Sequence, residues 1–305
     1  MGAMQKVMQK LQAKSHENGE GTAASPGAGT SVSAQETAAA ATSPDANPSG
    51  FVPDPSATPQ STGEVSDDGT NNWDMNKLDQ ALVAFHDRYS AVSEQYRSLR
   101  ARLLNMNPQN AHQVIAITSS LPQEGKSVTT LNLGMVMAEG NERQVLIADA
   151  DFRRASIARM LGIDAQPGLA ELIRGAAQLL DVLRPTPLPN LKVITAGATG
   201  DKKYGELIGA SATRAILAQL RERFDYTFLD TPPVNTVSDL SMLAPHCDGA
   251  MLMIEMRRTS EPTVQEAVRT LQTTNVKILG CILSRYDNQR SHYYERYYSY
   301  YYRDD

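Results

Sequence analysis

The chain contains 305 residues and has a formal net charge of -5 at pH 7. This length is enough for one sizeable α/β domain with additional segments, because single hydrophobic cores stop growing beyond roughly 250 to 300 residues. The acidic balance argues against nucleic acid as the main partner, since binding to a polyanion normally requires a basic face that releases counterions.

The sequence shows no signal for membrane crossing or export. It has no run of about 18 consecutive apolar residues, and its N-terminus lacks the apolar core of a signal peptide. The two cysteines, Cys247 and Cys281, form no CxxC pair and no disulfide pattern. We therefore expect a protein of the cytoplasm without a membrane span of its own, held at the inner face of the membrane only through a partner.

Residues 1–72 are predicted to be a disordered N-terminal segment. From Asn18 to Asn72 the chain is dominated by Ala, Ser, Thr, Gly, Pro and Asp, so it cannot bury enough apolar surface to offset the entropy of ordering. Only the short stretch from Met4 to Lys14 has the spacing of an amphipathic helix, and a helix of this length is marginal alone.

Residues 73–107 are predicted to form a long helix or a helix pair. Their apolar residues alternate in steps of four and three, which is the period of a helix with one buried stripe. On periodicity alone, core packing or a short coiled coil explains the pattern. The stripe consists of Leu78, Leu82, Phe85, Tyr89, Val92, Tyr96, Leu99 and Leu103.

Residues 108–284 are predicted to form an α/β domain. Apolar strands are expected at 114–118, 145–149, 191–196, 226–230, 250–254 and 277–283, and helices are expected to begin at Lys126, Ser211 and Glu261. This alternation predicts a mainly parallel sheet with helices on both faces. Residues 285–305 have no such pattern and are treated as a separate tail.

A glycine-rich loop follows the first strand. It reads Ser120-Leu-Pro-Gln-Glu-Gly125-Lys126-Ser127, with Ser120 where the general P-loop has its first glycine. Backbone N–H groups of such a loop surround phosphates, the lysine reaches the β and γ oxygens, and the serine hydroxyl ligates Mg²⁺. The predicted nucleotide-binding residues are Pro122, Gln123, Glu124, Gly125, Lys126, Ser127 and Val128.

Two further strands end in carboxylates. Asp149 ends the strand 145–149, Asp151 follows two residues later, and Asp230 ends the strand 226–230. Ligands of an open parallel sheet bind outside the carboxyl ends of the strands, so these groups are expected to meet the loop in one crevice. For any single aspartate, a buried carboxylate satisfied by backbone amides is the structural alternative.

From about Asp74 to Asp305 the chain resembles the bacterial tyrosine kinases of capsule and exopolysaccharide synthesis. The resemblance rests on an E-x-x-R-x-x-R helix (Glu94, Arg97, Arg100), the P-loop, the segments Asp149-Ala-Asp-Phe-Arg-Arg and Asp230-Thr-Pro-Pro, and a terminal tyrosine cluster. The sequence departs from the family at Gln123, where glycine is usual, at Ala155, where proline is usual, and at Ser284, where asparagine is common.

The resemblance implies a P-loop NTPase fold related to the partitioning ATPases, with ATP and Mg²⁺ as cofactors. It assigns the phosphates to Lys126 and the metal to Ser127 and Asp230. Of Asp149 and Asp151, which spacing alone leaves interchangeable, we favour Asp149 as the base and Asp151 as a metal-assisting residue. It also implies self-assembly through the E-x-x-R-x-x-R helix, ring-like in the family, and a transmembrane activator or polysaccharide co-polymerase as partner.

Seven of the 12 tyrosines lie within ten residues of the tail. The cluster presents no alternating face, as a strand would, and no basic groove, as stacking on single-stranded nucleic acid would need. Tyr293, Tyr294, Tyr297, Tyr298, Tyr300, Tyr301 and Tyr302 are therefore predicted to be phosphoacceptors.

The predicted function is a protein-tyrosine kinase that autophosphorylates this tail in trans and regulates polysaccharide synthesis and export. One alternative is a partitioning or positioning ATPase, although those proteins carry a lysine at the position of Leu121 and commonly end in a membrane or DNA contact. A non-catalytic nucleotide-dependent scaffold is the other alternative.

Overall fold

The computed structural model describes residues 74–285 except 141, 201–203, 209–210 and 237–238. The segment predicted to be disordered, the short helix predicted at residues 4–14 and the tyrosine cluster lie outside the described residues. None of the described helices is long and apolar enough to cross a membrane.

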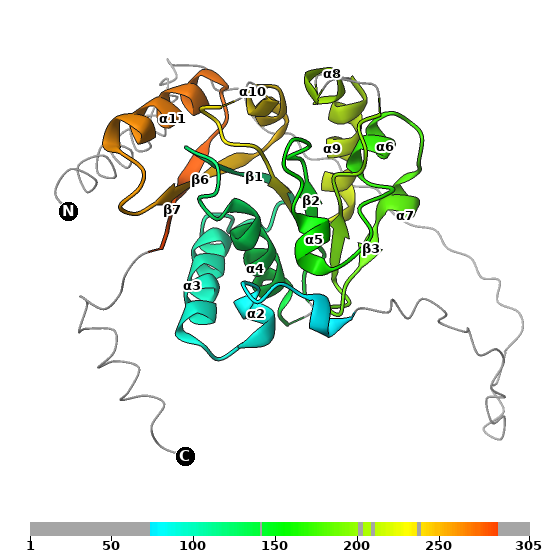
Figure 1. Ribbon diagram of the computed structural model, residues 1–305, viewed down its shortest axis with the longest axis horizontal. Helices are drawn as coiled ribbons and strands as arrows, with labels where there is room; N and C mark the ends of the chain where they lie inside the picture. Colours follow the sequence, from blue (N-terminus) through cyan, green and yellow to red (C-terminus); the bar gives the residue numbers. More distant parts are fainter. Residues whose placement is uncertain (1–73, 141, 201–203, 209–210, 237–238, 286–305) are drawn as a thin grey trace, which may run out of the picture. The chain divides into compact units, whose positions relative to one another are not determined.

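The described chain is built on a seven-stranded sheet with the order β3-β4-β2-β5-β1-β6-β7 (Figure 1). All neighbouring strands pair in parallel except β3 and β4, which confirms the predicted mainly parallel sheet. The strands are β1 (Gln113–Ser119), β2 (Val145–Asp149), β3 (Arg184–Pro185), β4 (Leu191–Ile194), β5 (Tyr226–Asp230), β6 (Gly249–Glu255) and β7 (Ile278–Ser284).

Helices cover both faces of the sheet. They are α2 (Val83–His86), α3 (Ala91–Asn105), α4 (Lys126–Ala138), α5 (Ile157–Leu161), α6 (Leu169–Ile173), α7 (Leu179–Val182), α8 (Tyr204–Ile208), α9 (Ser211–Arg223), α10 (Asp239–Leu243) and α11 (Glu261–Thr273). Short 3-10 helices occur at η1 (Met75–Lys77) and η2 (Ala244–His246). One apolar core joins the sheet to α3, α4 and α5, and a second joins the opposite face to α6, α7, α9 and α10.

The alternation of side chains along the strands explains the two cores. Ile115 and Ile117 of β1 belong to the core beside α4, whereas Val114 belongs to the core beside α9. Successive strand residues point to opposite faces, so a central strand covered on both sides must be apolar throughout. This requirement matches the continuous apolar runs from which the strands were predicted.

The N-terminal helices differ from the single buried stripe that periodicity predicts. The helical structure is interrupted between α2 and α3, where Ser90 caps α3 by accepting a hydrogen bond from the Ser93 amide. Leu82 is fully buried, but Tyr89 and Val92 of the predicted stripe are 90% and 46% exposed. The described residues form two helices, α2 and α3, and the stripe is interrupted because Tyr89, in the turn between them, and Val92, in the first turn of α3, are exposed.

Three short helices between β2 and β3 have no counterpart in the sequence prediction. Helices α5, α6 and α7 contain five, five and four residues. A helix of about one turn does not repeat its apolar period, so periodicity cannot detect it. Their buried residues instead complete the two cores.

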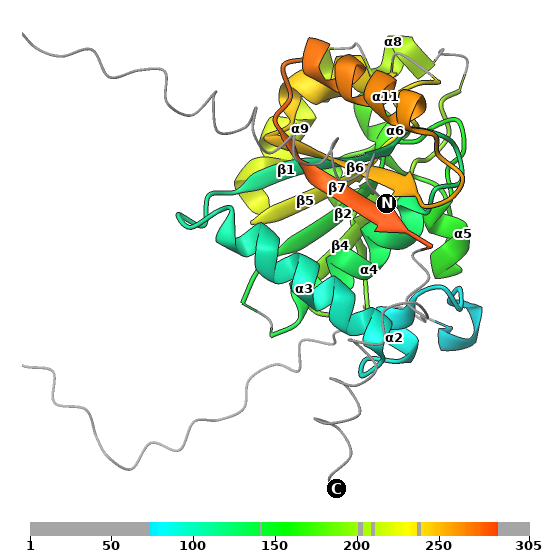
Figure 2. The same ribbon diagram turned by 90° about the vertical axis from the view of Figure 1, so that its left-hand side faces the viewer.

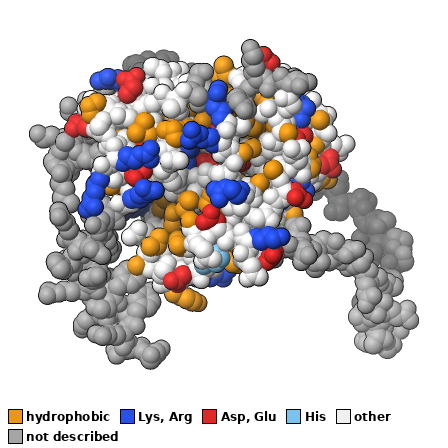
Figure 3. Space-filling view, viewed as in Figure 1, with side chains coloured by type: hydrophobic (Ala, Val, Ile, Leu, Met, Phe, Trp, Pro, Cys, Tyr) orange, Lys and Arg blue, Asp and Glu red, His pale blue; other side chains and the backbone are white. Residues whose placement is uncertain are grey.

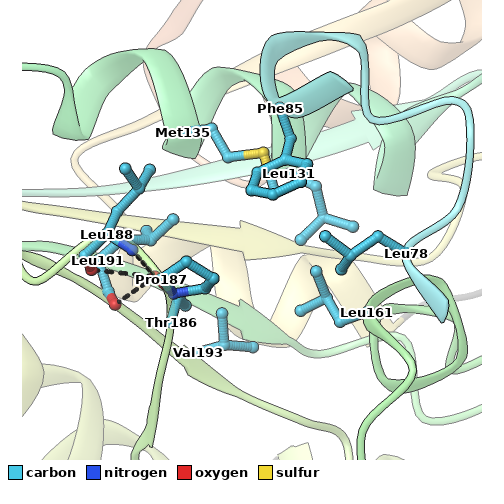
Figure 4. Close-up of a pocket in the computed structure, with 10 residues that line it drawn as sticks. All are labelled: Leu78, Phe85, Leu131, Met135, Leu161, Thr186, Pro187, Leu188, Leu191 and Val193. Carbon is cyan, nitrogen blue, oxygen red and sulfur yellow. Dashed lines mark hydrogen bonds between the residues drawn. The ribbon is translucent and has the colours of Figure 1, made fainter. Parts of the chain in front are cut away.

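A small apolar cleft lies between the N-terminal helices, α4 and the turn that leads into β4 (Figure 4). Thr186 at its edge donates hydrogen bonds to the carbonyls of Leu188 and Leu191. The lining residues are Leu78, Phe85, Leu131, Met135, Leu161, Thr186, Pro187, Leu188, Leu191 and Val193. None of them is a predicted site residue, so this cleft is separate from the nucleotide site.

Candidate nucleotide and phosphoryl-transfer site

The glycine-rich loop joins β1 to the first turn of α4. Gly125 precedes the helix with a φ of 95°, and Gln123 also has a positive φ, of 64°. Glycine adopts this left-handed conformation without a Cβ clash, whereas an L residue such as glutamine is strained in it. The backbone therefore gives a physical reason for the glycine that the family usually carries at the position of Gln123.

Glu124 anchors the loop from within the protein. Its side chain is almost fully buried and accepts hydrogen bonds from the Leu121 amide, at 2.9 Å, and from the Thr259 hydroxyl. The Glu255 amide, at the end of β6, lies 3.4 Å from the same carboxylate. The Glu124 side chain thus fixes the loop to β6 and to the start of α11, which leaves its backbone to contact a nucleotide.

Lys126, Ser127 and Asp230 meet at the start of α4. The Ser127 hydroxyl donates a hydrogen bond to Asp230 Oδ2. Burial raises the pKa of Asp230, and the charge of the buried Lys126 ammonium opposes this rise only in part. Asp230 Oδ1 is buried and has no hydrogen-bond partner among the described residues. A serine hydroxyl beside a carboxylate with an open oxygen is the ligand chemistry that Mg²⁺ prefers, so these residues fit the expected metal.

Asp149 and Asp230 lie opposite each other on the neighbouring strands β2 and β5. Burial is the main reason that the pKa of Asp149 rises to about 8, and the charge of Asp230 adds to the rise. Burial also raises the pKa of Asp230, to about 6. The charge of Lys126 and the hydrogen bond from Ser127 lower this pKa, but by less than burial raises it. Two facing carboxylates of this kind need a cation between or beside them when both are ionised.

Both aspartates after β2 also organise their own loop. Asp149 accepts hydrogen bonds from the amides of Asp151, Ser156 and Ile157, each at 3.1 Å. Asp151 is buried and accepts one from the Arg154 amide, also at 3.1 Å. Asp149 is therefore a buried carboxylate satisfied by backbone amides, which was the structural alternative for a single aspartate, and it also lies in the candidate site.

The residues of the E-x-x-R-x-x-R helix lie at the opposite end of α4 from the loop. Arg97 of α3 contacts Glu139 through Nε and Nη2, at 2.9 and 2.8 Å, and Glu94 through Nη1, at 3.3 Å. Arg100 donates to Glu139 Oε2 at 3.1 Å and to the Val136 carbonyl at 2.6 Å. These ion pairs raise the pKa of Arg97 further, and Figure 2 shows α3 lying along α4.

The structure thus gathers five predicted residues at the carboxyl ends of β1, β2 and β5: Lys126, Ser127, Asp149, Asp151 and Asp230. Glu94, Arg97 and Arg100 are remote from them, and the tyrosines lie outside the described residues. Sequence reasoning missed Glu255 and Thr259, which hold the loop. Glu255 directly follows the predicted strand 250–254, so the rule that located Asp149 and Asp230 would also have located it.

Comparison with known proteins agrees with this geometry. Residues 110–297 match the family model described as ParA, NUBPL iron-transfer P-loop NTPase. The tyrosine-protein kinase CpsD of Streptococcus agalactiae is 30% identical over 195 residues, which cover 64% of this chain and 83% of CpsD. The chain belongs to the bacterial tyrosine-protein kinases. The chain is also 29% identical over 200 residues to the succinoglycan biosynthesis transport protein ExoP of Rhizobium meliloti, and these residues cover 65% of this chain and 25% of ExoP.

Structural comparison gives a matching fold. The crystal structure of the chimerical protein CapA2B2 superposes with a TM-score of 0.63 at 26% identity and covers 68% of the kinase chain and 92% of its own. The match to ExoP includes 65% of the present chain but only 25% of the length of ExoP. The longer relatives therefore contain regions that these comparisons do not match.

Proposed function

We propose that this protein is an ATP-dependent tyrosine kinase that phosphorylates the tyrosines of its own C-terminal tail. The observation that carries the proposal is the group formed by Lys126, Ser127 and Asp230 with the buried Asp149 beside it, in a chain of the tyrosine-protein kinase family. The tyrosine-rich tail begins directly after β7, the strand that lies next to β6 in the sheet.

The chemistry requires charge neutralisation and a base. A phenol has a pKa of about 10 and attacks poorly at neutral pH unless a carboxylate takes its proton. In the proposed reaction the bond between the γ-phosphorus and the β,γ-bridging oxygen breaks, ADP leaves, a bond to the tyrosine Oη forms, and the phenol proton passes to Asp149. The position of Asp149 supports this role, because it ends β2 directly opposite the metal-binding Asp230 of β5, and a cation bound there favours the ionised carboxylate that can accept the proton.

The other residues position and neutralise the phosphates. Lys126 places its ammonium at the β and γ oxygens, and the amides of the loop and of the first turn of α4 surround them. Mg²⁺, when bound to Ser127 and Asp230, supplies further positive charge at the same oxygens. Asp151 assists the metal, and Glu124 holds the loop in place from behind.

Intact-mass measurement after incubation with Mg-ATP tests the activity. We expect repeated additions of one phosphate group in the wild type and none in the Lys126→Met variant. A variant with all seven tail tyrosines replaced by phenylalanine is the matched control, because it keeps the site and loses the acceptors. Absence of phosphate in the wild type would leave a nucleotide switch or a scaffold as the function.

Transfer in trans needs a separate test. Eight residues lead from Arg285 to Tyr293, so the Cα of the first acceptor can lie at most about 26 to 29 Å from that of Arg285. A Lys126→Met chain with an intact tail is mixed with the seven-phenylalanine chain, which has an intact site. Phosphate on the Lys126→Met chain means transfer between subunits, and no phosphate on either chain means transfer within one.

We further propose that the protein assembles with itself through Glu94, Arg97 and Arg100, works with a transmembrane activator, and regulates exopolysaccharide synthesis from the cytoplasm. The name of the succinoglycan biosynthesis transport protein ExoP supports the polysaccharide role. Replacing the chromosomal copy with the Lys126→Met allele tests it, and an unchanged polymer yield and length would refute the role.

A further inference from the structure

Three arginines stand at the ends of β6 and β7, next to the glycine-rich loop. We call Arg257, Arg258 and Arg285 the arginine rim; all three are exposed. Arg257 and Arg258 lie between Glu255 and Thr259, the two residues that hold the Glu124 side chain. Figure 3 shows lysine and arginine side chains gathered on this face of the molecule.

Arg285 reaches the same place from β7. It follows Ser284, whose Cβ lies 3.8 Å from the position that a Cβ on Gly125 would occupy. The Met256 amide also donates a hydrogen bond to the Ser284 carbonyl, at 3.1 Å, so the two chain segments are joined. The arginine rim is therefore fixed to the mouth of the nucleotide site by contacts from both strands.

The backbone of the arginine rim is strained. Among the described non-glycine residues, five have a positive φ, and two of these are asparagines, which tolerate it. The other three are Gln123 in the loop and Arg257 and Arg285 in the rim, with φ of 64°, 70° and 51°. A positive φ strains an L residue, and strain of this kind concentrates at functional sites.

A buried carboxylate sets the charge of the rim. Glu255 is 5% exposed and accepts hydrogen bonds from Arg258 Nη1, at 3.0 Å, and from Arg285 Nη1, at 2.9 Å. One negative charge thus holds two guanidinium groups side by side and leaves the rim with an excess of positive charge. A guanidinium has five N–H donors, so each of these two keeps donors for a second anion.

We propose that the arginine rim binds phosphotyrosines of a tail that has already been modified, from a second copy of this chain. This inference rests on the proposed kinase function and names a partner for the same site. Residues 286–305 carry three arginines against four carboxylate side chains, so the unmodified tail is close to neutral. Each phosphate adds about -1.5 to -2 charges at pH 7 and matches the geometry of a guanidinium.

The consequence is an ordered modification of the tail. A phosphotyrosine held by the rim keeps the neighbouring tyrosines of the same tail close to Lys126 and Asp149. The spacing of the acceptors, from Tyr293 to Tyr302 within ten residues, suits such retention. Affinity for the tail then rises with its phosphate content until repulsion among the phosphates limits further addition.

Fluorescence anisotropy tests this binding without any catalytic step. The protein is the full chain with its seven tail tyrosines replaced by phenylalanine, saturated with Mg-ADP to fill the loop. The probes are labelled peptides of residues 290–305, either unmodified or with phosphotyrosine at positions 294 and 298. We expect at least tenfold tighter binding of the phosphopeptide, and a tenfold loss in Arg257→Gln and Arg258→Gln.

Two control variants distinguish specific binding of the phosphopeptide from a loss of positive charge or of folding. Arg269→Gln removes an exposed arginine of α11 that pairs only loosely with Glu266, at 3.6 Å, and should leave the affinity unchanged. Arg257→Gln keeps both ion pairs of Glu255, so a folded variant remains even if Arg258→Gln unfolds.

Three results would overturn the proposal: equal affinity for the two peptides, an affinity unaffected by Arg257→Gln, or competition by phosphatidylserine vesicles with no preference for the phosphopeptide. Because the phosphopeptides are synthetic, failure here is distinguishable from failure of the kinase function, which the Lys126→Met experiment tests separately.

Discussion

Arg97 and Glu139 form a two-point ion pair that joins α3 to the residue directly after α4, with N–O distances of 2.9 and 2.8 Å. Arg100 adds a contact to the same carboxylate and one to the Val136 carbonyl. Cations near the C-terminus of a helix are also favoured by its dipole. The arginines that the family resemblance links to self-assembly therefore have an intramolecular partner in this chain.

Glu139→Gln is expected to lower the free energy of unfolding by about 1 to 2 kcal/mol, because two guanidinium groups lose a charged acceptor in a partly buried setting. Urea denaturation measures the change. The matched control is Glu142→Gln, whose exposed carboxylate only approaches Arg143, at 3.5 Å, and which should change stability by less than about 0.5 kcal/mol.

The same variant sharpens the test of self-assembly. If the arginines contact a second copy directly, Arg97→Ala with Arg100→Ala should lower the mass in light scattering, whereas Glu139→Gln should keep it. An equal loss in both variants would mean that displacement of α3, and not a lost contact between copies, breaks the assembly. Unchanged mass in the double arginine variant would refute a role of these residues in assembly.

Gln123→Gly is expected to stabilise the protein by about 0.5 to 1 kcal/mol. The φ of 64° strains glutamine but not glycine, and the gain is reduced by the greater freedom of glycine in the unfolded chain. Thermal unfolding gives the readout. Gln123→Ala serves as the control, since it removes the side chain but keeps the strained conformation; a gain from alanine as large as that from glycine would contradict the explanation.

The free energy of unfolding of the metal-free protein is expected to fall as pH rises from about 4 to about 8. Folding raises the pKa of Asp149 to about 8 and that of Asp230 to about 6. The folded chain therefore keeps protons that the unfolded chain releases near pH 4, and this stabilisation is lost as the pH passes the folded pKa values.

Urea denaturation at pH 5 and pH 8 measures this dependence. Mg²⁺ with ADP should restore stability at pH 8, because it binds the ionised carboxylates of the folded state. In the Asp230→Asn variant one of the facing charges is absent, so the decline should be shallower. A metal-free wild type that is as stable at pH 8 as at pH 5 would show that the two carboxylates are not buried together.

Leu82→Ala is expected to cost about 2 to 5 kcal/mol, because Leu82 is fully buried in the core beside α4. Val92→Ala, at a position that is 46% exposed, should change stability by less than about 0.5 kcal/mol. Chemical denaturation of both variants tests the packing. Equal, small effects would mean that residues 74–86 are not part of the core.

The sequence was sufficient to place the residues of the candidate site because strand order and motif position act together. Lys126, Asp149 and Asp230 each follow a continuous apolar run, and parallel strands bring their carboxyl ends to one edge. Glu139 could not be found in this way, since it lies 42 residues from Arg97 and belongs to no motif. Contacts of this kind depend on how one helix packs on another, which periodicity does not specify.

The burial of Leu78 and Leu82 against α4 has a practical consequence for the boundaries of the catalytic unit. A fragment that begins at residue 108 would include the entire nucleotide site, but it would uncover the apolar side of the helix that starts at Lys126. Such a fragment should aggregate or bind other apolar surfaces. The smallest piece of this protein able to fold and act on ATP is therefore expected to begin no later than Asp74.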